Sequence, residues 1–331
     1  MKLKKCAALL LVSSCLLTGC TTSSAKKVDS KYVVASLEKG NKTKNIFADN
    51  LYKDIIDNSS NNSTVFNAVL QNLVDQKFPV NDDMKEDAAT IIKQIKSAYK
   101  SNYGDNYKDS LNQALTSAGY KNLSEYRHKM IKQIQYANFL LDYIDDHFDD
   151  VFNDYYQQCA PKYVSLIKIS VSDTSSPTGD ETSKLNEVKE LISNTDKSFG
   201  DIAQDYSNDS TSSKKGSLGI VDSKDTSGIA NSYGKDVFNA IEALSEGQVS
   251  DVITGDNGYY FVKVTSTDKK TLKKELKKTD IDSPLLAYDD YLQYVVYNSY
   301  KINYKDKDIK KIVQEVVNKA LEERKTERGE A

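Results

Sequence analysis

The chain has 331 residues, with 45 Lys or Arg and 48 Asp or Glu, and a formal net charge of −3. The two signs of charge are well mixed, without the basic patch of a nucleic-acid-binding protein, so we expect no nucleic acid as partner. The length suits about two domains. Beyond the first twenty residues, no stretch has the roughly 18 apolar residues of a membrane-spanning helix.

The N-terminus has the pattern of an export signal. Residues 1–5 (MKLKK) are basic, residues 6–17 are apolar apart from two serines, and residues 17–20 read Leu-Thr-Gly-Cys. This order is typical of a secretory signal peptide. The ending is similar to a bacterial lipobox, in which cleavage leaves an N-terminal cysteine that takes a diacylglycerol. We predict a lipoprotein signal peptide over residues 1–19 and lipidation at Cys20; an ordinary signal with a chance cysteine is the alternative.

Lipidation would hold the protein at the extracytoplasmic face of the cell membrane, because two acyl chains give stable attachment where one is marginal. Removing 19 of the 331 residues leaves 312, and the three lysines lost with them leave 42 basic and 48 acidic side chains. Besides the anchor, only Cys159 remains, so no internal disulfide can form. Its thiol is either a reactive site or a buried small hydrophobic group.

Residues 20–30 are small and polar and predict a lipidated, flexible tether. Residues 31–160 are the expected N-terminal helical segment, because apolar residues recur at helical spacing from Ile46 to Gln158. The four stripes are Val65, Phe66, Val69, Leu70, Leu73 and Val74; Ile91, Ile92, Ile95, Ala98 and Tyr99; Leu111, Ala114, Leu115 and Ala118; and Tyr126, Met130, Ile134, Ala137, Leu141 and Ile144.

The pattern changes at Pro161, after which short strand-like and helix-like runs alternate as far as Asp268. The expected order is strand, helix, helix, strand, helix, strand, strand, at residues 163–171, 185–192, 199–206, 218–221, 237–244, 249–253 and 259–264. Asp256-Asn257-Gly258 predicts a hairpin turn between the last two strands. Residues 269–331 are helical again, with a regular apolar stripe from Ile309 to Leu321.

These patterns predict an α+β protein. A helical, chaperone-like lobe would be built from residues 31–160 and 269–331 packed together, since neither has an obvious closed core alone. An α/β domain over residues 161–268 would be inserted between them and fold independently.

Four stretches of the inserted segment resemble a parvulin-type (PpiC-like) peptidyl-prolyl isomerase, or rotamase. They are residues 199–209 (FGDIAQDYSND), 216–219 (GSLG), 244–251 (LSEGQVSD) and 258–264 (GYYFVKV). With the lipobox and helical flanks, the mature chain is similar to PrsA-type foldase lipoproteins of Gram-positive bacteria. The resemblance implies a chaperone for unfolded exported polypeptides that speeds isomerisation of their proline bonds, which takes tens to hundreds of seconds unaided.

The resemblance also implies site residues, and the sequence departs from the family at several of them. The family has one histidine on the first strand and one on the last, where this chain has Ser165 and Tyr260. Asp209 matches the acid of the loop after the second helix, and Phe238 is matched to the pocket phenylalanine. The pocket methionine has no counterpart. Ser165 and Tyr260 would be able to hydrogen-bond across the sheet, but the isomerase site is expected to be degenerate.

Other candidate sites are weak. His147 lies in the acidic run 145–150 (DDHFDD), which fits either a cation site or a solvated helix end; no known ligand spacing is present, so we expect no metal and no cofactor. His128, between Arg127 and Lys129, is expected at the surface. The 22 tyrosines either complete helix cores or line a groove for unfolded chains.

Three functions follow from these observations. The first is an extracytoplasmic foldase with isomerase activity, and the second is a catalytically silent holdase chaperone. The third is a solute-binding lipoprotein, which would need two α/β lobes where the sequence predicts one. Whether the chain is an enzyme therefore depends on Asp209, Ser165 and Tyr260.

Overall fold

The computed structural model describes residues 27–39, 42–276 and 281–330, and these form two compact units. The first unit comprises residues 81–290, and the second comprises the described residues up to 80 together with residues 291–330. The predicted signal peptide and Cys20 lie outside the described residues. Among the described residues, no helix combines the length and the apolar character needed to cross a bilayer.

The first unit begins with four helices. They are α3 (Asp82–Tyr103), α4 (Tyr107–Ser117), α5 (Leu123–Asp146) and α6 (Phe148–Cys159), with the 3₁₀ turn η3 (Gly104–Asn106) between α3 and α4. The Asn81 side chain caps α3 by accepting from the Met84 N–H at 2.9 Å, as an N-cap asparagine commonly does. The stripes predicted from sequence meet in one apolar cluster of α3, α4 and α5 that includes Ala88, Leu111 and Ile134.

The α/β segment of the first unit follows α6. Its elements are β4 (Lys162–Ser170), α7 (Gly179–Asn194), α8 (Phe199–Tyr206), η4 (Ser212–Lys214), β5 (Ser217–Val221), α9 (Ile229–Tyr233), α10 (Lys235–Ala243), β6 (Ile253–Gly255) and β7 (Gly258–Ser266). The strands form one antiparallel sheet in the order β5-β4-β7-β6. The predicted element order is confirmed, with the short helix α9 in addition.

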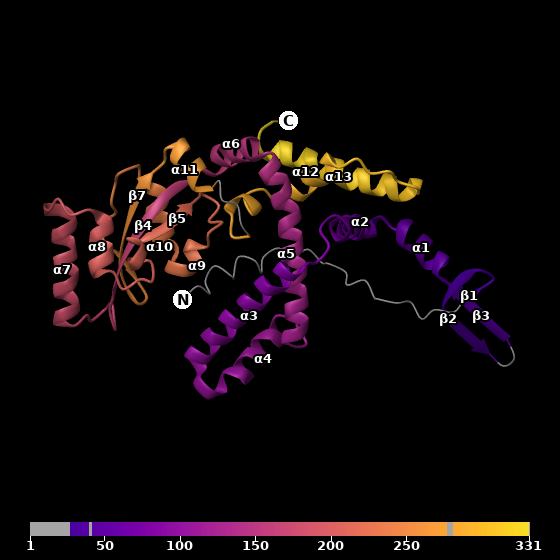
Figure 1. Ribbon diagram of the computed structural model, residues 1–331, viewed down its shortest axis with the longest axis horizontal. Helices are drawn as coiled ribbons and strands as arrows, with labels where there is room; N and C mark the ends of the chain where they lie inside the picture. Colours follow the sequence, from indigo (N-terminus) through magenta and orange to yellow (C-terminus); the bar gives the residue numbers. More distant parts are fainter. Residues whose placement is uncertain (1–26, 40–41, 277–280, 331) are drawn as a thin grey trace. The chain divides into compact units, whose positions relative to one another are not determined.

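Helices cover both faces of this sheet (Figure 1). On one face, Val164, Leu166 and Val262 pack against α9 and α10 through Ile229, Val237 and Ile241; we call this the inner face. On the outer face, Ile167, Ile169 and Phe261 pack against α7 and α8 through Val188, Phe199 and Ile202. Successive strand residues point to opposite faces, which explains why the strands read as nearly continuous apolar runs.

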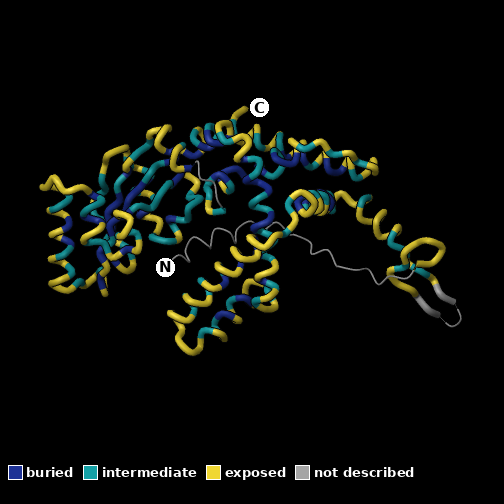
Figure 2. The backbone as a smooth tube through the Cα atoms, in the orientation of Figure 1, coloured by how far each residue is buried: buried dark blue, intermediate teal, exposed yellow. Residues whose placement is uncertain are grey.

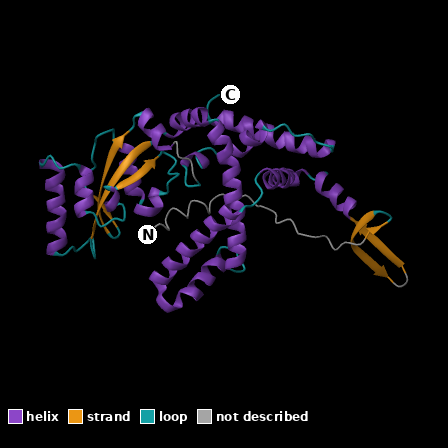
Figure 3. Cartoon of the chain, viewed as in Figure 1, coloured by secondary structure: helices purple, strands orange, loops and turns teal. Residues whose placement is uncertain are grey.

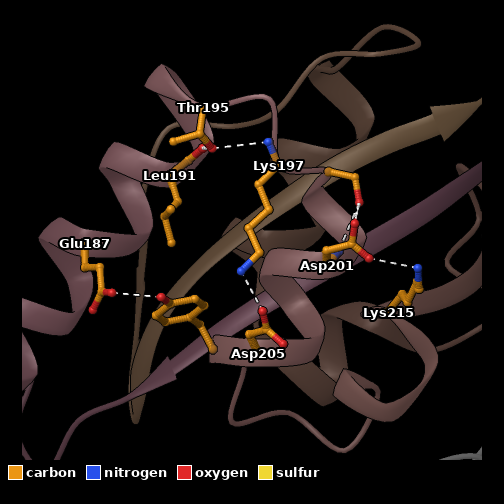
Figure 4. Close-up of polar contacts among 9 residues, drawn as sticks. Glu187, Leu191, Thr195, Lys197, Asp201, Asp205 and Lys215 are labelled. Atoms are coloured by element: carbon orange, nitrogen blue, oxygen red, sulfur yellow. Dashed lines mark hydrogen bonds and ion pairs between the residues drawn. The ribbon is translucent and has the colours of Figure 1, made fainter.

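Polar side chains fasten α8 to its neighbours on the outer side of the segment (Figure 4). The Tyr206 hydroxyl donates to Glu187 of α7 at 2.8 Å, and the Lys197 ammonium lies 2.6 Å from the Asp205 carboxylate. Asp201 binds Lys215 at 2.8 Å, and Ser198 caps α8 by accepting from the Asp201 N–H. Each such exposed pair adds little to the free energy of unfolding. The pairs therefore set the orientation of α7 and α8 more than they stabilise the fold.

A buried carboxylate joins α6 to the loop after β5. Asp222, which is fully buried, accepts hydrogen bonds from the Tyr155 hydroxyl at 2.8 Å and from the Thr226 hydroxyl. The N–H groups of Lys224 and Thr226 also donate to it, at 3.0 and 3.3 Å. The pKa of Tyr155 is raised, first by burial and then by the charge of Asp222.

The end of the first unit closes over the same joint. Helix α11 (Lys269–Leu276) follows β7, and the 3₁₀ turn η5 (Pro284–Leu286) packs against α5 and α6. The Tyr288 ring meets the Tyr155 ring edge-on at 5.4 Å, and its hydroxyl donates to Asp154 at 2.8 Å. The α/β segment is therefore bonded to α6 by a buried polar network as well as by the chain.

The second unit contains β1 (Lys27–Val28), β2 (Lys31–Lys39), β3 (Lys42–Phe47), α1 (Ala48–Ile56), η2 (Ser59–Asn61), α2 (Asn62–Lys77), α12 (Leu292–Ser299) and α13 (Lys307–Glu327). Helix α2 packs against α13, and the Phe66 ring lies 5.0 Å from Tyr294 and 5.1 Å from Tyr297 of α12. Residues from both ends of the chain thus share one core.

Two features differ from the sequence predictions. Residues 27–28, 31–39 and 42–47 form a small antiparallel sheet in the order β1-β2-β3, where the sequence predicts the end of a tether and the start of a helical segment. The β-branched run at Val33 and Val34 favours a strand, and helical periodicity begins only at the end of this sheet. In addition, the N-terminal helices divide between the units, with α2 in the second and α3 to α6 in the first. The domain boundaries at 161 and 268 remain a prediction.

Candidate functional site on the inner face of the sheet

The register of β4 against β7 decides which candidate residues meet. Tyr260 of β7 pairs with Lys168 of β4, whereas Ser165 pairs with Lys263. Because side chains alternate along a strand, Ser165 lies on the outer face with Ile167, and Tyr260 on the inner face with Val262. Ser165 and Tyr260 therefore do not hydrogen-bond across the sheet as expected from the sequence; the strand residue that faces Tyr260 is Lys168.

Lys168, Asn257 and Tyr260 form a compact polar group. The Asn257 side-chain oxygen accepts from the Lys168 ammonium at 2.9 Å and from the Tyr260 hydroxyl at 2.8 Å. The same ammonium lies 5.6 Å from the centre of the Tyr260 ring, within the range of a cation–π contact. Asn257 sits in the two-residue turn between β6 and β7, so the hairpin itself supplies the bridging group.

Tyr233 connects this group to Asp209. Its ring meets Tyr260 edge-on at 6.2 Å, and its hydroxyl donates to the Asp209 carboxylate in a long hydrogen bond of 3.4 Å. Burial raises the pKa of Tyr233, and the negative charge of Asp209 raises it further. The pKa of Tyr260 is raised by the same two causes in the same order. Both hydroxyls therefore stay protonated at neutral pH and can donate hydrogen bonds.

The loop that carries Asp209 is bonded to the edge of β4. The Asn208 N–H donates to the Lys168 carbonyl at 2.8 Å, and the Lys168 N–H donates to the Ser207 hydroxyl at 3.0 Å. Asp209 itself is buried and accepts from the Thr211 N–H at 2.9 Å. The positions of Asp209 and Lys168 are thus coupled through the backbone.

A glycine allows this loop to rejoin the sheet. Gly216 has φ +76°, and a Cβ at this position would lie 2.5 Å from the Leu166 carbonyl oxygen and 2.8 Å from the Ala203 Cβ. Its own carbonyl accepts from the Leu166 N–H at 2.8 Å. Only glycine fits this close approach, so the residue serves the scaffold.

Phe238 lies on α10 and is half-buried against the inner-face cluster that includes Tyr260. The preceding residue, Val237, is the one that points fully into the core. Tyr233, Phe238 and Tyr260 together bring three aromatic side chains to one face. Aromatic surface next to protonated hydroxyls suits contact with a proline ring and hydrogen bonds to peptide carbonyls.

Neither histidine of the chain belongs to this group. His128 is exposed on α5, and His147 caps the C-terminal end of α5, where its ring stacks on Tyr143 and its Nδ1 lies 2.9 Å from the Tyr143 carbonyl oxygen. Within the part of the chain that the structure describes, no three His, Cys, Asp or Glu side chains gather as metal ligands would. Cys159 is fully buried at the end of α6.

Sequence reasoning missed Lys168, Asn257 and Tyr233. A signal for the first was present, because Lys168 is the one charged residue inside the apolar run 164–169 (VSLIKI). A lysine within a buried strand must reach a polar partner or solvent. Its position therefore indicates where the face of the sheet is not covered by apolar side chains. For Asn257 the sequence pattern predicts only a turn.

Comparisons with known proteins agree with this architecture. Residues 166–266 match the family model of the rotamase, the PPIC-type PPIASE domain. The foldase protein PrsA of Staphylococcus epidermidis is 32% identical over 141 residues, which cover 40% of this chain and 41% of that protein. PrsA of Staphylococcus aureus strain MRSA252 matches with the same identity and coverage. The chain thus spans about two fifths of the length of these curated relatives.

Two solved structures are also similar. The crystal structure of PrsA from Bacillus subtilis has a TM-score of 0.39 at 21% identity, covering 86% of this chain and 98% of that one. PrsA from Streptococcus pneumoniae has a TM-score of 0.39 at 19% identity, covering 85% and 99%. The family match identifies residues 166–266 as a parvulin domain of the PPIC type, in a chain whose relatives include PrsA foldases.

Proposed function

We propose that the chain is an extracytoplasmic foldase that acts on unfolded exported polypeptides and works more as a chaperone than as an isomerase. The observation that carries this is the inner face of the parvulin domain. It keeps the sheet, the tight loop at Gly216 and an aromatic surface, but it presents Lys168 and Tyr260 as cross-strand partners without any imidazole.

This face is suited to binding a proline-containing peptide. Rotation about the peptide bond has a barrier of about 18–20 kcal/mol because the planar amide is stabilised by resonance. A site lowers the barrier only by binding the twisted transition state better than the planar ground state. The half-buried Tyr233 and Phe238 rings can remove water from the amide.

Polar groups of the face limit this effect. The Tyr260 hydroxyl and the Lys168 ammonium both donate to Asn257. The Tyr260 phenol has a single O–H, so any hydrogen bond that it donates to a twisted amide competes with its bond to Asn257. We therefore expect weak turnover.

One pair of assays tests the proposal. Residues 20–331 with Cys20→Ser are assayed for proline isomerisation in a short peptide and for suppression of aggregation of an unfolded client. We expect clear suppression at stoichiometric amounts and isomerase activity far below that of a parvulin with both histidines. Asp209→Ala should change suppression little.

Adjacent tyrosines supply a matched control. Tyr260→Phe removes a hydroxyl from the inner face, while Tyr259→Phe removes one from the other side, where it donates to the Thr174 carbonyl. Tyr260→Phe alone should reduce the residual isomerase activity. Robust isomerase turnover that Asp209→Ala abolishes would contradict the proposal and would show that the chain is a true isomerase. Absence of any client protection would contradict the chaperone role.

A further inference from the structure

The small N-terminal sheet and helix α1 expose large apolar side chains, a class of residue that is mostly buried in the rest of the described chain. Eight large apolar residues are exposed among the described residues, and seven of them fall between residues 28 and 55. They are Val28, Tyr32, Val34, Ile46, Leu51, Tyr52 and Ile55, and the eighth is Tyr103. Figure 2 shows the contrast between this exposed stretch and the buried sheet of the parvulin domain. A concentration of this kind marks an interaction surface.

The strand register defines one face of this sheet. Val33 and Phe47 are cross-strand partners and half-buried, and α1 packs on β2 and β3. Tyr32 and Ile46, their neighbours along each strand, therefore point to the opposite face. Both are exposed, at 46% and 44%. Helix α1 lies on the face of Val33, where Lys31 of β2 pairs with Asp49 of α1.

Two lysines share the exposed face. Lys27 is the cross-strand partner of Tyr32, and its ammonium lies 4.6 Å from the centre of the Tyr32 ring. Lys44 is exposed and precedes Ile46 by two residues, so it lies on the same side of β3. We call Lys27, Tyr32, Lys44 and Ile46 the hairpin surface. Lys31 lies on the other face, where it pairs with Asp49 at 3.4 Å.

The charge of this segment differs from that of the chain. Residues 27–47 contain five lysines against Asp29 and Glu38, whereas the mature chain has an excess of acidic side chains. Lysines beside an aromatic and an aliphatic residue are the combination that binds anionic lipid, because the cations meet the headgroups and the apolar groups enter the interface. A neutral or basic partner would not account for the lysines.

Position along the chain favours the same partner. Lys27 is seven residues from Cys20, and seven residues span at most about 25 Å. If Cys20 is lipidated as we predict, the hairpin surface stays within that distance of a bilayer. We propose that the hairpin surface docks on the anionic lipid surface of the membrane and so gives the anchored protein a second point of attachment.

Vesicle binding of the unlipidated chain tests this proposal. Residues 20–331 with Cys20→Ser are sedimented with vesicles of phosphatidylglycerol and phosphatidylcholine, and with vesicles of phosphatidylcholine alone. We expect binding only to the anionic vesicles, with loss of binding at high salt. Each lysine near such a surface contributes about fivefold in affinity, so Lys27→Gln with Lys44→Gln should weaken binding about 25-fold.

Two further variants complete the design. Tyr32→Ser with Ile46→Ser should weaken binding while the thermal melt stays unchanged, because both side chains are exposed. Lys311→Gln with Lys319→Gln is the matched control, since these side chains of α13 are 75% and 78% exposed and lie outside the surface. Equal loss in the control and hairpin variants would overturn the proposal, as would equal binding to both kinds of vesicle.

Other occupants of the hairpin surface would give different results. If the surface binds a second copy of the chain, Tyr32→Ser with Ile46→Ser would change the mass in solution and leave vesicle binding unaffected. If it binds unfolded clients, aggregation suppression without vesicles would fall. Either result overturns the membrane assignment and leaves the proposed foldase function standing.

Discussion

The ammonium of Lys168 lies over the ring of Tyr260, and the two residues are direct partners across β4 and β7. Asn257 binds both side chains, so a turn residue, a strand cation and a buried phenol act as one group. The antiparallel sheet that contains them is shown in Figure 3. Tyr260 stands where the parvulin resemblance implies one histidine, whereas the other implied position, Ser165, lies on the opposite face of the sheet from this group.

Placing histidines at Lys168 and Tyr260 should raise isomerase activity. We expect Lys168→His with Tyr260→His to increase the rate at least tenfold over the parent, because the two rings would face each other on the inner face of the sheet. The measurement is proline isomerisation in a short peptide. Ser165→His with Tyr260→His is the matched control and should not gain, since Ser165 lies on the outer face. A gain in the control alone would show that Ser165 holds the functional position.

Loss of the buried carboxylate should destabilise the joint between α6 and the parvulin domain. Asp222→Ala leaves the buried Tyr155 hydroxyl and two backbone N–H groups without their acceptor, which should cost about 3 kcal/mol in the free energy of unfolding. Urea denaturation of the parent and the variant measures this loss in the free energy of unfolding. Tyr155→Phe, which removes one donor and keeps the ring, should cost about 1 kcal/mol. Equal small losses in both variants would contradict a shared network.

The contact between Tyr155 of α6 and Asp222 should also affect how stably the α/β segment folds alone. A fragment of residues 161–268 should melt cooperatively, but at a lower temperature than a fragment of residues 148–290. The longer fragment restores Tyr155 beside Asp222 and Tyr288 beside Tyr155. Calorimetry of both fragments checks this prediction. A shorter fragment without a cooperative melt would show that the domain begins before Pro161.

A hydrogen bond between distant residues should make the second unit sensitive to alkali. The Tyr52 hydroxyl donates to Asp306 at 2.5 Å, and this bond is the main cause that raises the pKa of Tyr52 to about 12. Because the folded pKa is raised, the contribution to stability is complete below pH 10 and is lost as the pH rises through about 12.

The pKa of Asp306 is lowered, chiefly by the same hydrogen bond. Its contribution is therefore present above the ordinary pKa of an aspartate and is lost as the pH falls through the folded pKa. The difference in unfolding free energy between the parent and Tyr52→Phe should be flat near neutral pH and shrink at both extremes. Tyr103→Phe, at an exposed tyrosine of α3, is the control. A difference that persists at pH 12 would speak against this bond.

Lipidation at Cys20 remains a prediction that cell fractionation can check. Cys20→Ala should release the protein into the medium and abolish labelling with a fatty-acid probe. Membrane retention and labelling that stay unchanged would show that the residue is not the anchor.

Local sequence determined most of the elements of the parvulin domain. The Ser198 cap, the apolar runs and the Asp256-Asn257 turn act over a few residues, so their patterns could be read without knowledge of distant contacts. Asp209 lies between α8 and η4, and its role in a site remains a prediction. The strands at residues 27–47 were missed because that sheet is short and mostly exposed, which leaves a weak apolar pattern.

Only the tertiary structure decided which residues meet. A shift of three positions along β4 separates Ser165 from Lys168, and an odd shift moves a side chain to the other face of the sheet, so register had to be known before the site could be assigned. The contacts of Tyr155 with Asp222 and of Tyr52 with Asp306 join residues 67 and 254 positions apart. No periodicity within one element encodes such pairs, because they depend on how separate elements pack.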